Sequence, residues 1–211
     1  MAICQLKNIC SFIGIVLSVG IFASAVYIGA FHHVHVYEST IPNRTFFYKN
    51  YKKAYINLAD DIQSNMKFIQ SNSMLCNKTE FMGLYYDNPN QIDQDNLPRS
   101  TIGFYTTGNI SSNTIDEIIS QGYIPVKLNS TKAVQTYIQW RYPYSIWVVI
   151  LKLYNPLLKT LLQRYTNLLG KDIPYVEYVS QGSFIVSYPI GEERSQYILT
   201  NVTASKIEPV Y

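Results

Sequence analysis

An uncharged stretch of 23 residues, Ile9 to Phe31, constrains this chain more than any other part of its sequence. As a helix rising about 1.5 Å per residue, it would extend about 34 Å, enough to cross a bilayer core of about 30 Å. The sequence therefore predicts a transmembrane helix over residues 9–31. A short flank, residues 1–8, precedes it, and about 180 residues follow it, enough for one domain with its own core.

A cleaved signal peptide is the alternative interpretation of this stretch. Lys7 would supply the positive region, Phe12 to Phe22 the apolar region, and Ala23 to Ala25 an A-x-A cleavage site. The apolar run continues past that site to Phe31, however, and a signal peptide does not need this extension. We therefore expect a permanent anchor in the lipid bilayer.

The charges on either side of the stretch predict its orientation. Lys7 precedes it, whereas Arg44, Lys49, Lys52 and Lys53 follow it. Because cytosolic flanks carry the excess of Lys and Arg, we expect the N-terminus in the lumen and the domain in the cytosol.

Five Asn-x-Ser/Thr sequons favour the opposite orientation, because in a lumenal or secreted domain they would be glycosylation acceptors. They begin at Asn43, Asn77, Asn109, Asn129 and Asn201. A secreted or lumenal glycoprotein is therefore an alternative to the cytosolic domain.

Composition excludes several classes of protein. Hydrophobic residues make up 47% and charged residues 15%, which argues against a disordered chain. The net charge of +3 is small and its Lys and Arg are scattered, so we expect no direct binding of nucleic acid. Three cysteines give no disulfide framework. The cluster of His32, His33 and His35 has too few neighbouring ligands for a zinc site, so we expect no metal. No phosphate-binding or dinucleotide-binding loop is present, so we expect no cofactor.

Periodicity predicts a mixed α+β domain over residues 37–190, followed by a C-terminal extension, 191–211. Strands are expected at 37–48 with an interruption near Pro42, and at 81–86, 100–106, 123–128, 133–142, 175–179 and 184–189. Helices are expected at 53–70, from a capping box at Thr114 to Gly122, and at 145–169 with Asn155 as an N-cap inside it. The order describes a duplicated strand–helix–strand–strand unit, with antiparallel sheets and helices on one face. The two halves are expected to leave a ligand cleft between them.

Four motifs carry a resemblance to a known family. They are Gly83 to Pro89, Leu97 to Ser100, Tyr142 to Trp147 before the long helix, and Tyr175 to Tyr178. They resemble the signatures of GyrI-like domains, the effector-binding modules related to the ligand domains of bacterial multidrug regulators. In many such domains, a strand like 175–178 carries an acidic residue in the cleft.

Together with the anchor, the chain resembles the testis-expressed ER-membrane proteins of animals that serve as ER-phagy receptors. The resemblance implies a single-pass protein of the endoplasmic reticulum membrane that acts as a receptor or adaptor in selective autophagy of the ER (reticulophagy). It also implies ubiquitin-like autophagosomal proteins and a AAA segregase as partners, and a link to DNA–protein crosslink repair.

Those relatives bind autophagosomal proteins through an aromatic-x-x-aliphatic motif in an acidic tail. This sequence ends at Tyr211 without such a tail. Two internal matches, Tyr55 to Leu58 and Trp147 to Ile150, fall within predicted helices, and we expect them to pack in the core.

Glu177 is the most informative acid in the sequence. A carboxylate buried among aromatic rings would suit a flat cationic ligand, and Tyr85, Trp140 and Trp147 are the aromatic residues expected beside it. Such a membrane-tethered ligand-binding module is the alternative to the adaptor role. A solvent-facing Glu177, or one paired with Arg99 or Arg141, would instead have a structural role. No second catalytic group accompanies Glu177, so we do not expect an enzyme.

Overall fold

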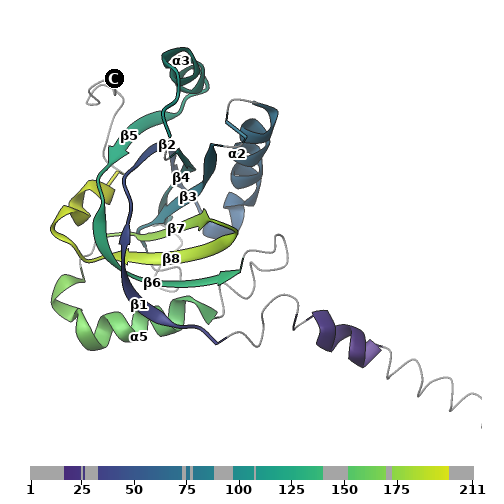
Figure 1. Ribbon diagram of the computed structural model, residues 1–211, viewed down its shortest axis with the longest axis vertical. Coiled ribbons are helices and arrows are strands. Elements are labelled where there is room, and N and C mark those ends of the chain that lie inside the picture. Colours follow the sequence, from purple (N-terminus) through teal and green to yellow (C-terminus); the bar gives the residue numbers. More distant parts are fainter. Residues whose placement is uncertain are drawn as a thin grey trace, which may run out of the picture.

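A computed structural model describes residues 17–24, 26, 33–72, 75–76, 78–87, 97–106, 108–139, 152–169 and 173–199. Of the predicted anchor, residues 17–24 form a helix with exposed apolar side chains, drawn in purple in Figure 1. Residues 9–16, 25 and 27–31 lie outside the described part. No helix within the described residues is both long and apolar enough to cross a membrane.

The described strands form one continuous sheet in which every pairing is antiparallel, rather than the separate sheets that the sequence predicts. They are β1 (Val36–Ile41), β2 (Arg44–Lys52), β3 (Thr79–Tyr85), β4 (Arg99–Thr106), β5 (Ile124–Leu128), β6 (Thr131–Gln139), β7 (Tyr175–Ser180) and β8 (Ser183–Pro189). Their order across the sheet is β1-β6-β8-β7-β3-β4-β2-β5. The mixed α+β class is therefore confirmed.

Helices connect the strands. The α-helices are α2 (Ala59–Ser71), α3 (Ser112–Ser120) and α5 (Tyr154–Arg164), and the 3-10 helices are η1 (Tyr55–Leu58), η3 (Thr166–Leu168) and η4 (Glu192–Tyr197). Two predicted helix starts are wrong. Ser111, not Thr114, caps α3, because its hydroxyl accepts a bond from the backbone N–H of Thr114 at 3.3 Å. Asn155 lies inside the first turn of α5. Pro156 is tolerated in that turn because its missing N–H would have no partner there.

The strand order repeats between the two halves of the chain. The first half runs β2, α2, β3, β4 along the chain, and β4 lies between β2 and β3 in the sheet. The second half runs β6, α5, β7, β8, and β8 lies between β6 and β7. The halves meet where β3 pairs with β7, and Gly83 lies directly opposite Glu177 in that pair. This arrangement matches the duplicated unit predicted from the sequence.

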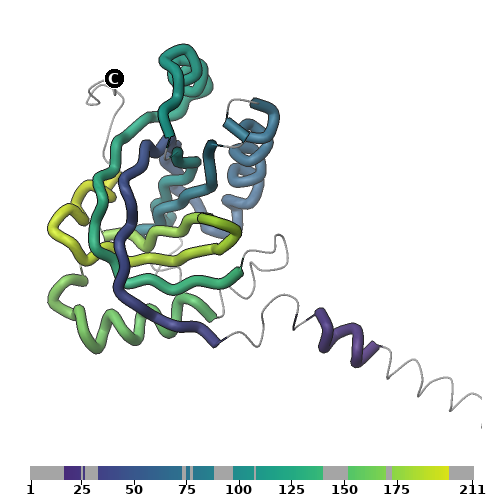
Figure 2. The backbone as a smooth tube through the Cα atoms, viewed as in Figure 1, coloured from purple at the N-terminus to yellow at the C-terminus, as the bar shows by residue number. Residues whose placement is uncertain are grey.

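Two bent strands close the sheet on itself. Only Pro42 and Asn43 separate β1 from β2, and only Asn129 and Ser130 separate β5 from β6. Because β1 pairs with β6 and β2 with β5, the two long strands run side by side through both bends (Figure 2). At the bend, the backbone N–H of Ser130 donates to Oδ1 of Asn43 at 2.6 Å. The strands at the two ends of the sheet order therefore meet at one corner.

Alternate residues of each strand point to opposite faces of this sheet, and each face has its own core. The helix face packs against α2, α3 and α5, with Phe104, Ile118 and Leu157 fully buried. The opposite face encloses a second core that includes Met82 and Tyr48. Tyr197 of η4 closes that core and is itself fully buried. On β7, the alternation places Val176 in the second core and Glu177 on the helix face.

Candidate functional site

Glu177 is a buried carboxylate at the junction of the two halves. It lies in the middle of β7 with 8% of its surface exposed, so the solvent-facing alternative is wrong. The hydroxyl of Tyr154, from the first turn of α5, donates a hydrogen bond to its Oε1. The hydroxyl of Tyr85, from the end of β3, donates a second one. Three segments distant in the sequence thus converge on this acid.

The electrostatics of Glu177 follow from this environment. Burial raises the pKa of its carboxyl from 4.5 to about 7, although the bonds from Tyr154 and Tyr85 favour the charged form. Within the described residues, no Lys or Arg lies within ion-pair distance of Glu177. Arg99 pairs with Asp87 instead, and Arg141 lies outside the described part. Near neutral pH, this carboxyl therefore carries a partial charge without a counter-ion in the described chain.

Four tyrosines surround the acid: Tyr55, Tyr85, Tyr154 and Tyr175, here called the tyrosine cluster. Tyr55 meets Tyr85 edge to face at 5.2 Å between ring centroids, and Tyr154 meets Tyr175 in the same way at 5.4 Å. All four keep part of their surface exposed. The rings therefore extend from the buried carboxylate to the protein surface.

Gly83 makes room for this arrangement. It lies on the helix face, two residues before Tyr85 and directly opposite Glu177. Because Gly83 has no side chain, the Tyr85 ring can occupy the space above β3. A Cβ atom at Gly83 would lie 2.9 Å from Cε2 of Tyr85 and 3.2 Å from its hydroxyl oxygen. A larger residue would therefore displace the ring that donates to Glu177.

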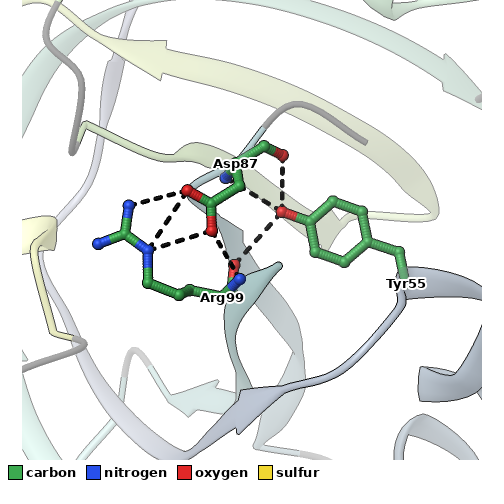
Figure 3. A network of polar contacts seen from close by, with 3 residues as sticks. All are labelled: Tyr55, Asp87 and Arg99. Atoms are coloured by element: carbon green, nitrogen blue, oxygen red, sulfur yellow. Dashed lines mark hydrogen bonds and ion pairs between the residues drawn. The ribbon is translucent and has the colours of Figure 1, made fainter. Parts of the chain in front are cut away.

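A polar network holds the outer edge of the cluster (Figure 3). The Tyr55 hydroxyl donates to the carbonyl oxygen of Asp87 at 2.7 Å and accepts from its backbone N–H at 3.1 Å. The Asp87 carboxylate in turn binds the Arg99 guanidinium at 2.8 Å and 3.1 Å, and the Arg99 backbone N–H at 2.7 Å. These bonds join η1 to the ends of β3 and β4, and they fix the ring of Tyr55.

The sequence identifies part of this site. Tyr85 and Glu177 lie together in the structure, whereas Trp140 and Trp147 lie outside the described residues. Sequence reasoning missed Tyr55, Tyr154 and Tyr175. Tyr175 has a detectable signal, because residues two apart on a strand share a face. Tyr55 and Tyr154 have none, since only tertiary packing brings them to Glu177.

Other predicted features have no comparable arrangement. No group of three or more His, Cys, Asp or Glu side chains suited to a metal occurs in the described part of the chain. Among the clustered histidines, His33 and His35 contact each other edge to face at 4.6 Å, and His32 lies outside the described residues. Of the two autophagy-motif matches, the described one ends at Leu58, which is 1% exposed and packs in the core as predicted, whereas Ile56 within it is 83% exposed.

No family model matches this chain, and no curated protein matches it. Several solved structures resemble it, among them the following three. SAV2435 bound to tetraphenylphosphonium is 15% identical, with 75% of this chain and 94% of that chain covered and a TM-score of 0.49. The EcmrR C-terminal domain is 13% identical, with 74% and 96% covered and a TM-score of 0.43. An integron cassette protein from the mobile metagenome of Vibrio cholerae is 16% identical, with 75% and 99% covered and a TM-score of 0.42. These likenesses are distant, and only the residues of the site carry a functional inference.

Proposed function

We propose that this domain binds a small organic cation with a flat or bulky apolar surface, and that Glu177 is its counter-ion. The observation that carries the proposal is a carboxylate with 8% exposure and no cation within ion-pair distance among the described residues. Natural proteins rarely bury a charge without pairing it. A ligand that brings its own positive charge would supply the missing partner.

The tyrosine cluster suits the rest of such a ligand. Rings of Tyr, Phe and Trp attract cations over their faces, by about 0.5–2 kcal/mol for each contact. The hydroxyls of Tyr85 and Tyr154 are already engaged with Glu177, so these residues offer mainly their rings. A lipophilic cation would therefore gain both charge pairing and apolar contact at one place.

Titration calorimetry with tetraphenylphosphonium at pH 8 tests the proposal, since that cation combines one charge with a large apolar surface. We expect Glu177→Gln to weaken binding at least about tenfold, because the variant keeps the shape but removes the charge. Glu80→Gln is the matched control. Glu80 also accepts a bond from a tyrosine hydroxyl, that of Tyr105 at 2.6 Å, but lies outside the tyrosine cluster. Equal binding by wild type and Glu177→Gln would refute the proposal.

Tethering to the endoplasmic reticulum membrane, with the domain in the cytosol, is the second part of the proposal. The uncharged stretch 9–31 and the basic residues Lys49, Lys52 and Lys53 that follow it support this placement. Protease protection of microsomes, with endoglycosidase digestion alongside, tests it. A domain that external protease digests and that carries no glycan agrees with the proposal. A protected domain that loses mass on deglycosylation would establish the lumenal alternative.

An adaptor role in reticulophagy is not part of the proposal. In the described match to the autophagy motif, the aliphatic position is Leu58, the last residue of η1, and its side chain is buried away from any partner. The other match, at residues 147–150, lies outside the described part of the chain.

A further inference from the structure

The ion pair of Asp87 and Arg99 borders the proposed cation site. Asp87 lies two residues beyond the end of β3, and Arg99 is the first residue of β4. Their side chains meet through two guanidinium nitrogens, and both are about one-third exposed at 28% and 32%. The pair therefore lies at the rim of the site.

Tyr55 connects this pair to Glu177. Its hydroxyl bonds both backbone groups of Asp87, and its ring packs edge to face on Tyr85, which donates to Glu177. The pKa of Tyr55 is raised to about 12, chiefly by burial. The backbone hydrogen bond with Asp87 and the charge of Arg99 lower this pKa, whereas the charges of Asp87 and Glu177 raise it. Both carboxylates thus lie within electrostatic reach of one hydroxyl.

We infer that Arg99 makes the site select ligands with one positive charge over ligands with two. It neutralises Asp87, and within the described residues this leaves Glu177 as the one carboxylate beside the tyrosine cluster that has no basic partner. A ligand with one charge meets one free carboxylate. A ligand with two charges would bring its second charge to a rim where Arg99 offsets Asp87. This inference rests on the proposed function and specifies the ligand class of the same site.

A purely structural role for Arg99 makes a different prediction. The Asp87–Arg99 pair also orients Tyr55 through the bonds shown in Figure 3. If orientation were its whole contribution, losing Arg99 would weaken every ligand by a similar factor. If charge decides, the loss changes the ratio of affinities between ligands of one and two charges.

Two probes of nearly the same shape separate these roles: 1-methyl-4-phenylpyridinium, with one charge, and methyl viologen, with two. Calorimetry at pH 8 gives the ratio of their dissociation constants for each variant. In Arg99→Gln, the guanidinium charge that offsets Asp87 is lost, and we expect the ratio to shift toward methyl viologen by about threefold to tenfold, the effect of one partly screened charge. Arg99→Lys keeps the charge without the fork of donors and should retain the wild-type ratio.

The double variant Asp87→Asn with Arg99→Gln removes both charges and should restore the wild-type ratio. Asp87→Asn alone removes the negative charge that offsets Arg99 and should shift the ratio away from methyl viologen, so the inference stays testable even if Arg99→Gln does not fold. An unchanged ratio in both single variants, or an equal loss for both probes, overturns the inference while leaving the proposed function intact. A wild-type protein that binds neither probe nor tetraphenylphosphonium overturns both.

Discussion

The buried carboxyl of Glu177 should cost the folded protein stability at neutral and alkaline pH, and Glu177→Gln should recover it. The amide of glutamine has nearly the shape of a protonated carboxyl and keeps an oxygen that accepts from Tyr85 and Tyr154. It never ionises, however, so folding does not have to bury a charge.

The magnitude follows from the pKa of Glu177, which burial raises from 4.5 to about 7. Between these values, the folded state holds a proton that the unfolded state has already released. Stability therefore falls as the pH rises from about 4.5 to about 7, and changes little above it. At about 1.4 kcal/mol for each tenfold change in proton affinity, the total loss is about 3 kcal/mol. We expect Glu177→Gln to exceed wild type in free energy of unfolding by about 1 kcal/mol at pH 5 and about 3 kcal/mol at pH 8.

Urea denaturation of the full-length chain in a mild detergent, at pH 5 and at pH 8, measures this difference. Glu80→Gln serves as the control, because Glu80 also accepts from a tyrosine hydroxyl but is only partly buried. A saturating cation at pH 8 should stabilise wild type more than Glu177→Gln, by about 1.4 kcal/mol for each tenfold difference in affinity, since a ligand stabilises the state that binds it. If the two proteins show the same stability at both pH values, the carboxyl is not held in the buried, unpaired state argued here.

Three further substitutions test the packing around the site. Gly83→Ala should weaken tetraphenylphosphonium binding about tenfold in calorimetry, because the new Cβ would lie 2.9 Å from the Tyr85 ring; unaltered affinity would count against the placement of that ring. Tyr197→Phe should leave the melting temperature unchanged or raise it, because the buried hydroxyl has no hydrogen-bond partner within the described residues; a clear fall would reveal a partner. Leu157→Ala should lower the free energy of unfolding by about 2–5 kcal/mol, because Leu157 is fully buried. Leu158→Ala, at a position 38% exposed, should lower it by less than about 0.5 kcal/mol. Similar losses for the two variants would contradict the orientation of α5.

Local sequence patterns predicted most of the secondary structure. The hairpin of β7 and β8 was predictable because Gln181 and Gly182 interrupt two β-rich runs, and both adopt positive φ angles in the turn, +49° and +73°. The end of α3 was predictable from Gly122, which has a φ of +82°. These features depend on residues only a few positions apart, so their determinants are local.

The tertiary structure decided where charges lie, and Arg44 shows this most clearly. In the sequence, it reads as one of the basic residues that flank the predicted anchor on the cytosolic side. In the structure, it is 3% exposed, with its guanidinium 4.2 Å from the ring of Tyr105 and 4.4 Å from that of Tyr178. Because Arg44 is buried in the second core, it adds no charge to the protein surface, although a count of the flanking basic residues includes it.

The candidate site has the same origin. The sequence alone determined that Glu177 stands on a strand among aromatic residues, because alternation and composition are local properties. Only the closed sheet decided that Tyr85 and Tyr154 donate to it, and that Arg99 pairs with Asp87 rather than with Glu177. The physical reason is the pairing of β3 with β7, which joins strands about 90 residues apart, a distance over which a one-dimensional pattern carries no information about contact.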